Sequence, residues 1–221
     1  MKRKARAFLF DMDGVIVDSN PVHRVAWVEY NRRHGVETTP EMHERMYGKR
    51  NHVLIRDFLG DHLTDEEIDR HSELKEELFR RMMLPRIRES LVPGLRSFLE
   101  RYRGVPMAVA SNASPENVEF VLREAGLGEF FPVALHGGEV ARAKPYPDIY
   151  LRAAELLGVA AAECVVFEDS ATGVEAGVAA GMPVVGLSTT HETLEGVEVL
   201  VRDFNDPALE AWLSGALATV S

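Results

Sequence analysis

Apolar and polar positions alternate in a regular way over most of the chain. Short apolar runs, typical of buried strands, occupy residues 7–10, 106–110, 133–135, 165–167 and 184–187. Amphipathic helical patterns occupy residues 94–103, 115–125, 147–157 and 171–180, and a last one begins at residues 205–207. Because short strands that alternate with helices form βαβ units, the pattern predicts an α/β fold with a parallel sheet and helices on both faces.

Residues 19–90 carry helical signals and no strand pattern. An apolar stripe predicts a first helix, and its members are Val22, Val25, Ala26 and Val28. Further helix starts and ends are indicated by Pro21, Gly35, Pro40, Asn51, Gly60, Thr64 with Glu67, and Pro85. We interpret Trp27 as a core residue of this part rather than as the wall of a pocket. The sequence thus predicts an inserted α-helical domain at residues 19–90 and a core domain made of residues 1–18 and 91–221.

The strand pattern at residues 7–10 leads directly into two carboxylates and a glycine. Side chains at positions i and i+2 of a strand lie on the same face, so Asp11 and Asp13 begin on one side, and Gly14 lets the chain turn away. Taken alone, this D-x-D-G segment fits both an ordinary turn after a strand and a pair of functional carboxylates. In a functional pair, one carboxylate can bind a cation or attack an electrophile while the other transfers a proton.

Other polar residues follow later strands in equivalent positions. Ser111 follows the run at 106–110, and Glu168 and Asp169 follow the run at 165–167. Ligands of parallel sheets bind at the carboxyl ends of the strands. These side chains therefore converge with Asp11 if their strands are neighbours.

Four segments of the chain together identify a family resemblance. They read F-D-M-D-G-V-I-V-D-S from Phe10, S-N-A-S from Ser111, K-P-Y-P-D from Lys144 and F-E-D-S from Phe167. Each resembles one of the four motifs of the haloacid dehalogenase-like hydrolases, and they occur in the family's order. The helical insertion resembles the cap of the beta-phosphoglucomutase-like and phosphoglycolate-phosphatase-like branch. The resemblance implies a Rossmann-like, doubly wound parallel sheet with an inserted α-helical cap, and a phosphoric monoester hydrolase.

Phosphoryl transfer requires an in-line nucleophile and cations that screen negative charge. Asp11 is the candidate nucleophile, and an anion can attack phosphorus only if a cation such as Mg²⁺ reduces the repulsion. We expect the ion to be bound by the carboxylates of Asp11, Glu168 and Asp169 and by the backbone carbonyl of Asp13, as the resemblance also implies. Asp13 is the candidate acid and base, which protonates the leaving oxygen and then activates the water that cleaves the aspartyl phosphate.

The candidate phosphate-binding residues are Lys144, Ser111 and Asn112. Lys144 supplies a compact positive charge to the phosphorylated Asp11. Ser111, with nearby backbone N–H groups, donates hydrogen bonds to the phosphate oxygens. Asn112 lies beside Ser111 in the same motif. The residue pair Asn112-Ala113 is more similar to the hydrolases than to the sugar-phosphate mutases of this branch.

Substrate choice is expected to depend on the cap. Its candidate residues are polar and partly cationic, and they are His23, Lys49, Arg50 and Asn51. Such a lining suits a sugar or a small acid better than a nucleobase or a lipid. The resemblance implies that His23 supports the acid/base aspartate, and that mutases place an arginine after a G-x-S turn to bind a second phosphate. Here that turn reads Gly48-Lys49-Arg50-Asn51, so we favour a sugar-phosphate phosphatase and keep a beta-phosphoglucomutase-type mutase as the alternative.

Composition narrows the range of partners. A net charge of −10 and a pI near 5.3 argue against non-specific binding to nucleic acid or to an anionic membrane. The longest apolar runs fall well short of the roughly 20 residues that span a bilayer. We therefore expect a cytoplasmic protein. The resemblance implies that its partner is a small phosphate ester, and we expect a monomer. The single cysteine, Cys164, opens an apolar run and is interpreted as a core residue.

Two other classes with a catalytic aspartate fit the sequence less well. A dehalogenase uses the same nucleophile but needs neither Asp13 nor magnesium. A receiver domain also combines a phosphorylated aspartate with magnesium and lysine, but it lacks a helical insertion of this size. Both expectations favour the phosphatase-like interpretation.

Overall fold

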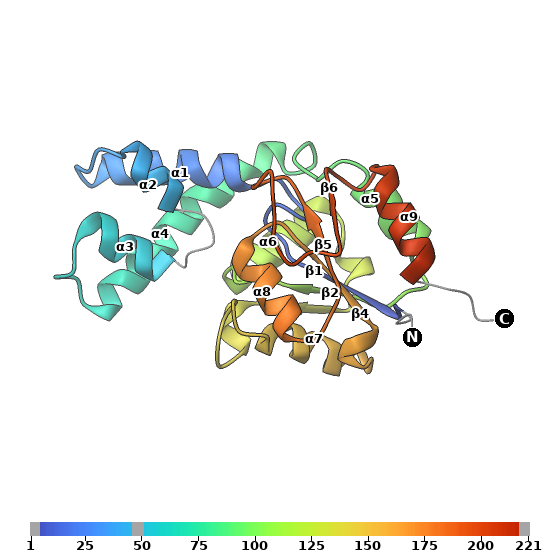
Figure 1. Ribbon diagram of the computed structural model, residues 1–221. Helices are drawn as coiled ribbons and strands as arrows, with labels where there is room; N and C mark the ends of the chain where they lie inside the picture. Colours follow the sequence, from blue (N-terminus) through green and yellow to red (C-terminus); the bar gives the residue numbers. More distant parts are fainter. Residues whose placement is uncertain (1–4, 46–50, 217–221) are drawn as a thin grey trace. The chain divides into compact units, whose positions relative to one another are not determined.

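The computed structural model describes residues 5–45 and 51–216, and its contacts divide the chain into two units. One unit comprises Met1–Asp18 and Ser90–Ser221, and the other comprises Ser19–Glu89. The strands of the first unit form one parallel sheet in the order β3-β2-β1-β4-β5-β6 (Figure 1). They are β1 (Ala7–Phe10), β2 (Met107–Ala110), β3 (Val133–Leu135), β4 (Cys164–Glu168), β5 (Val184–Leu187) and β6 (Val199–Val201).

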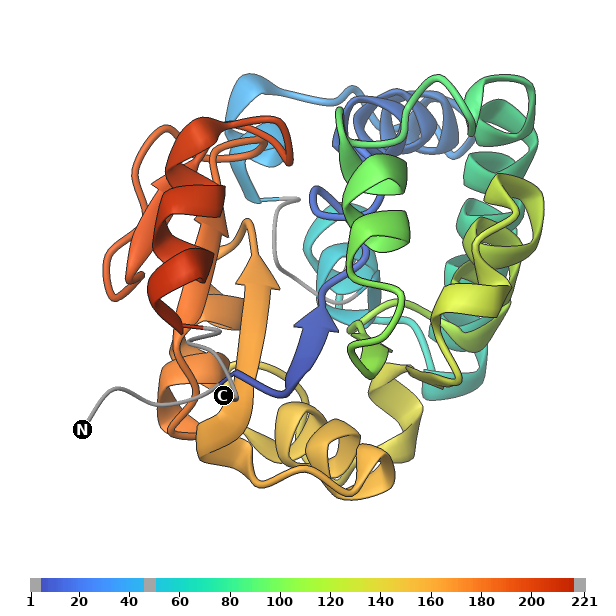
Figure 2. The same cartoon turned by 90° about the vertical axis from the view of Figure 1, so that its right-hand side faces the viewer.

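The strand order places a switch point at β1. From β1 the chain continues to β2 and β3 on one side, and then crosses to β4, β5 and β6 on the other. Phe10 pairs with Val109 of β2 and with Phe167 of β4, and Figure 2 shows the arrows of β1 and β4 side by side and pointing the same way. The carboxyl ends of these three strands therefore open onto one edge of the sheet, where doubly wound folds bind ligands. The predicted α/β class is confirmed.

Helices cover both faces of this sheet, and each face has its own packing. The helices are α5 (Leu95–Arg101), α6 (Pro115–Ala125), α7 (Asp148–Leu157), α8 (Ala171–Ala179) and α9 (Pro207–Ala216), with short 3-10 turns η2 (Gly128–Phe130), η3 (Gly137–Glu139) and η4 (Ala161–Glu163). On one face, α7 and α8 pack over small and branched side chains such as Leu9 and Val166. On the other face, Phe98 of α5 packs against Phe8 and Phe167. Cys164 is fully buried, and burial raises the pKa of its thiol to about 11, as expected of a core residue.

The second unit is helical throughout its described part. It contains α1 (Asn20–Arg33), α2 (Pro40–Arg45), α3 (Asn51–Leu59) and α4 (Asp65–Met83), followed by the 3-10 turn η1 (Leu84–Arg86). The predicted capping box is present, because Thr64 accepts from the Glu67 N–H and the Glu67 side chain accepts from the Thr64 N–H. Trp27 is 2% exposed and packs edge-on against Phe58, so its assignment to the core is confirmed. Over the described residues, every helix is too short or too polar to cross a membrane.

Two details of the sequence prediction need correction. Strand β6 was not predicted, because its run is short and two of its three residues are only half-buried at the sheet edge. In α1, Val22 is buried as expected, but Val25 and Val28 are exposed. The buried face of α1 follows the 3.6-residue period from Val22 through Ala26 to Tyr30, which turns positions 25 and 28 away from it.

Gly177 allows α8 to pack closely against the sheet. A Cβ built on this glycine would lie 2.7 Å from Cγ2 of Val184 and 3.4 Å from Cγ1 of Val166. The first distance is shorter than real side-chain contacts allow. Any larger residue at this position therefore requires the Val184 side chain or the helix itself to shift.

We predict that Gly177→Ala lowers the free energy of unfolding by about 1–3 kcal/mol, as overpacking typically does. The matched control is Gly215→Ala in α9, where a Cβ would meet nothing within 4 Å. That control should be neutral or stabilising by up to about 1 kcal/mol, because alanine favours helix more than glycine does. Urea denaturation of both variants measures the difference. A stabilised Gly177→Ala variant would contradict the packing argument.

Candidate active site

Asp11 and Asp13 lie in a tight turn directly after β1. The Asp11 N–H donates to the carbonyl of Phe167, which ties the turn to β4. Gly14 has φ +77° and its N–H donates to the Val17 carbonyl, which closes the turn. A Cβ on Gly14 would overlap Oδ2 of Asp169, so the turn can approach this carboxylate only because residue 14 is glycine. The D-x-D-G segment is therefore a structured turn that brings β1 and β4 carboxylates together.

Lys144 connects two buried carboxylates across the sheet edge. Its Nζ donates to Oδ1 of Asp11 and to Oε1 of Glu168, both at 2.6 Å, and its side chain is 3% exposed. Burial alone would lower the pKa of Lys144, but the charges of Asp11 and Glu168 raise it above its usual range. Lys144 is therefore a charged lysine at neutral pH.

Glu168 is fully buried and its two oxygens accept a dense set of hydrogen bonds. Oε1 accepts from Lys144 and from the hydroxyl of Tyr150 at 2.8 Å. Oε2 accepts from the N–H groups of Asp169 and Ser170, at 3.0 and 3.1 Å, and from the Ser170 hydroxyl at 3.0 Å. A Cβ on Gly173 would overlap this carboxylate, so the start of α8 also packs tightly on it. Glu168 thereby fixes the position of Lys144.

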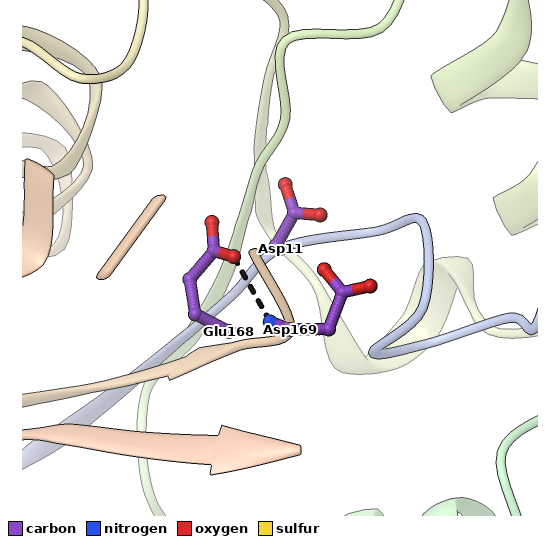
Figure 3. Close-up of side chains that lie close together, drawn as sticks. All are labelled: Asp11, Glu168 and Asp169. Atoms are coloured by element: carbon purple, nitrogen blue, oxygen red, sulfur yellow. Dashed lines mark hydrogen bonds between the residues drawn. The ribbon is translucent and has the colours of Figure 1, made fainter. Parts of the chain in front are cut away.

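Asp11, Glu168 and Asp169 form a cluster of carboxylates (Figure 3). One oxygen from each residue lies within 4.8 Å of the others, and all three residues are buried. Burial raises the pKa of Asp11 to about 7. The negative charges of Glu168 and Asp13 add to this rise, and the charge of Lys144 offsets only part of it. Burial also raises the pKa of Asp169 well above its usual range, with Glu168 and Asp11 adding to the effect. Lys144 therefore does not balance the negative charge of the whole cluster.

Such a cluster has the donor set that a hard divalent cation requires. Mg²⁺ prefers carboxylate and carbonyl oxygens, and it is commonly held by one or two carboxylates. Burial is the main cause of the raised pKa values of Asp11 and Asp169, and a bound cation would relieve the repulsion between carboxylates that adds to it. The residues present therefore fit a magnesium ion.

Ser111 and Asn112 follow β2, the neighbour of β1. Ser111 is 2% exposed, its N–H donates to the Leu135 carbonyl, and its Oγ accepts from the Ala113 N–H at 3.1 Å. The hydroxyl hydrogen can therefore be donated to a ligand oxygen. Oδ1 of Asn112 accepts from the backbone N–H of Lys144 at 3.3 Å, which connects the end of β2 to the segment that carries Lys144. Contacts thus connect the predicted residues at the ends of β1, β2 and β4 with Lys144.

In the helical unit, His23 and Asn51 are linked through a buried ion pair that the sequence analysis missed. Nζ of Lys75 lies 2.8 Å from Nδ1 of His23 and 2.8 Å from Oε1 of Glu76, and Lys75 is 1% exposed. Asn51 donates to the same Glu76 oxygen at 2.6 Å. Because an ammonium only donates, Nδ1 of His23 accepts and its ring hydrogen lies on Nε2. Lys49 and Arg50 lie outside the described residues.

A sequence signal for this ion pair does exist. Lys75 and Glu76 occupy positions of α4 between the buried residues Ile68 and Phe79, on the helix face that carries the apolar stripe. Long charged side chains are rarely buried unless they are paired. Two adjacent charges of opposite sign on an apolar face therefore indicate an internal ion pair.

Comparison with known proteins agrees with this geometry. A family model described as haloacid dehalogenase-like hydrolase matches residues 5–181. Fructose-1-phosphate phosphatase YqaB of Escherichia coli is 31% identical over 84% of this chain and 97% of its own length. Hexitol phosphatase A of the same organism is 34% identical over 86% of each chain. The crystal structure of beta-phosphoglucomutase from Clostridium difficile matches with a TM-score of 0.84 at 25% identity, covering 96% of this chain and 97% of that one.

We predict that Glu76→Gln lowers the free energy of unfolding at pH 7 by about 3 kcal/mol, because it leaves Lys75 buried without a counter-charge. Burial alone would raise the pKa of Glu76, but the charge of Lys75 and hydrogen bonds from Lys75 and Asn51 lower it to about 2. The usual value is 4.5, so the unfolded chain binds this proton first as the pH falls. The stabilisation is therefore present above about pH 4.5 and lost at about 1.4 kcal/mol per pH unit below it.

Equilibrium denaturation of wild type and variant at pH 7, 4.5 and 3.5 measures this difference. The control is Glu77→Gln, an exposed neighbour on the same helix, which should unfold like the wild type. A gap between wild type and Glu76→Gln that stays constant over this pH range would show that Glu76 does not stabilise the helical unit through its charge.

Proposed function

The chain belongs to the haloacid dehalogenase-like hydrolases, in their beta-phosphoglucomutase-like branch, and is a phosphoric monoester hydrolase; we propose that it is a Mg²⁺-dependent phosphatase of a small sugar phosphate. The observation that carries this proposal is the buried Asp11, held by Lys144 at 2.6 Å beside the carboxylates of Glu168 and Asp169. A nucleophile, a cation for the transferred group and a cation-binding set are thus adjacent, as phosphoryl transfer requires.

Asp11, Asp169 and the backbone carbonyl of Asp13 would hold the magnesium ion. Both oxygens of Glu168 already accept hydrogen bonds, so we place this residue at the edge of the metal site, where it adds negative charge and anchors Lys144. When bound, the ion supplies positive charge that reduces the repulsion between Asp11 and an anionic phosphate. With the pKa of Asp11 at about 7, this charge also favours the ionised, nucleophilic form.

In the proposed reaction, a carboxylate oxygen of Asp11 attacks phosphorus and the bond to the leaving oxygen breaks. Asp13 gives its proton to that oxygen, which releases the sugar. Asp13 then takes a proton from a water molecule, and the water attacks the aspartyl phosphate and returns Asp11 to its free form. Lys144 and the Ser111 hydroxyl stabilise the negative charge on the phosphoryl oxygens in both steps.

The helical unit is proposed to act as a cap that selects the substrate. His23 and Asn51 are held in fixed positions by Lys75 and Glu76, which suits polar groups that bind a hydroxylated molecule. The relatives named as phosphatases of fructose 1-phosphate and of hexitol phosphates support a sugar phosphate as the substrate.

A mutase is the second candidate. It is favoured by the similarity of the whole chain to beta-phosphoglucomutase of Clostridium difficile. A mutase would use the same nucleophile but return the phosphoryl group to the sugar instead of transferring it to water. The two candidates differ in their products and can be separated by assay.

We predict that a panel of sugar phosphates releases inorganic phosphate in the presence of Mg²⁺, and that EDTA stops this release. Excess Mg²⁺ should restore it, because the ion is required to screen Asp11 from the substrate. Phosphate release and isomerisation of a sugar 1-phosphate to its 6-phosphate are measured in parallel, with a sugar bisphosphate as primer. Isomerisation without phosphate release would favour the mutase. Turnover at an equal rate in EDTA would contradict the metal-dependent mechanism.

We predict that Asp13→Asn lowers kcat by about 10²- to 10⁴-fold, the usual effect of losing a general acid and base. Asp11→Asn should abolish turnover, since it removes the nucleophile. Acid-quenched enzyme should contain labelled phosphate for Asp13→Asn and none for Asp11→Asn, because only the former retains the phosphate acceptor. Full activity of a correctly folded Asp13→Asn variant would show that another group transfers the proton.

A further inference from the structure

Two threonines that follow β5 contact the candidate active site from a segment outside the four motifs. The hydroxyl of Thr189 donates to the carbonyl of Gly14 at 2.6 Å. The hydroxyl of Thr190 donates to Oδ2 of Asp169. One short segment therefore binds both the turn that carries Asp13 and a carboxylate of the cluster.

Two contacts restrict the position of Oδ2 of Asp169. Gly14 packs against it so closely that a Cβ at position 14 would overlap Oδ2, and Thr190 donates a hydrogen bond to the same atom. Asp169 is 3% exposed, and its N–H donates to Glu168. With Oδ2 held in this way, rotation of the carboxylate is limited, and Asp169 keeps a fixed orientation in the cluster that it forms with Asp11 and Glu168.

We propose that Thr190 is a positioning residue for the metal site, which orients the Asp169 carboxylate for cation binding, while Thr189 fixes the adjacent turn at Gly14. This inference rests on the proposed function, because it concerns the proposed magnesium ion. Partners of metal-binding carboxylates orient those ligands, and their loss typically reduces metal affinity by about 10- to 100-fold. The role is indirect, since the Thr190 hydroxyl acts through Asp169.

The test compares Thr190→Val, which keeps the shape but removes the hydroxyl, with Thr190→Ser, which keeps the hydroxyl. Binding of Mn²⁺ to the enzyme without substrate is measured by electron paramagnetic resonance, and Mg²⁺ by calorimetry. Thr190→Val should bind both ions about 10- to 100-fold more weakly, and Thr190→Ser should stay within a few-fold of wild type. Thr193→Val is the matched control, because Thr193 is an exposed residue of the same loop.

Kinetic measurements separate positioning from a general structural defect. The Mg²⁺ concentration for half-maximal activity should rise in Thr190→Val in proportion to its weaker binding, while KM for the substrate at saturating Mg²⁺ stays near the wild-type value. Wild-type metal affinity in a folded Thr190→Val variant, or equal weakening in Thr190→Ser, would overturn the inference and leave the proposed function intact. A wild-type enzyme that binds neither ion and is active in EDTA would overturn the proposed function, and this inference with it.

Discussion

The constraint on which the core unit depends is the burial of several carboxylates around one lysine. Lys144 donates to Asp11 and Glu168 at 2.6 Å, and the desolvation of such charges is costly unless each oxygen has a partner. The fold supplies those partners for Glu168 from the backbone, from Ser170 and from Tyr150. The cost of burying the lysine is thereby offset, and Asp11 is held at a defined position at the sheet edge.

The rest of the core places these groups with little freedom. Phe10 and Phe167 pair in register on adjacent strands, and their rings stack at 4.7 Å with an angle of 6° between them. Asp11 and Glu168 directly follow these two residues, so the pairing of β1 with β4 brings them close together. Gly14 and Gly173 then allow backbone to approach the carboxylates closely. The packing of the core next to this edge of the sheet thus determines how close the carboxylates lie to one another.

Much of this arrangement follows from local sequence signals, and the remainder depends on contacts between distant segments. Strand β3 and helix α6 have the expected bounds, because their apolar patterns end at clear sequence signals, such as Gly126 at the C-cap of α6. The four motifs mark the residues that meet at the ends of β1, β2 and β4. Tyr150 and Thr190 could not be predicted, since nothing near them in sequence identifies Glu168 or Asp169 as a partner. Lys75 could have been found from its place on the apolar face of α4.

The two units bury a lysine in different charge environments, and the difference bears on function. In the helical unit, Lys75 has one buried carboxylate partner, Glu76, and a histidine that accepts through Nδ1, so the cluster is balanced by its own side chains. In the core, Lys144 faces Asp11 and Glu168, with Asp169 close by. Burial raises the pKa values of both Asp11 and Asp169, and the excess of negative charge around them adds to the rise. A cluster whose charges balance can serve as a rigid support. An excess of buried carboxylates is stabilised when a cation binds. The core cluster is therefore the place where metal and phosphate chemistry is expected.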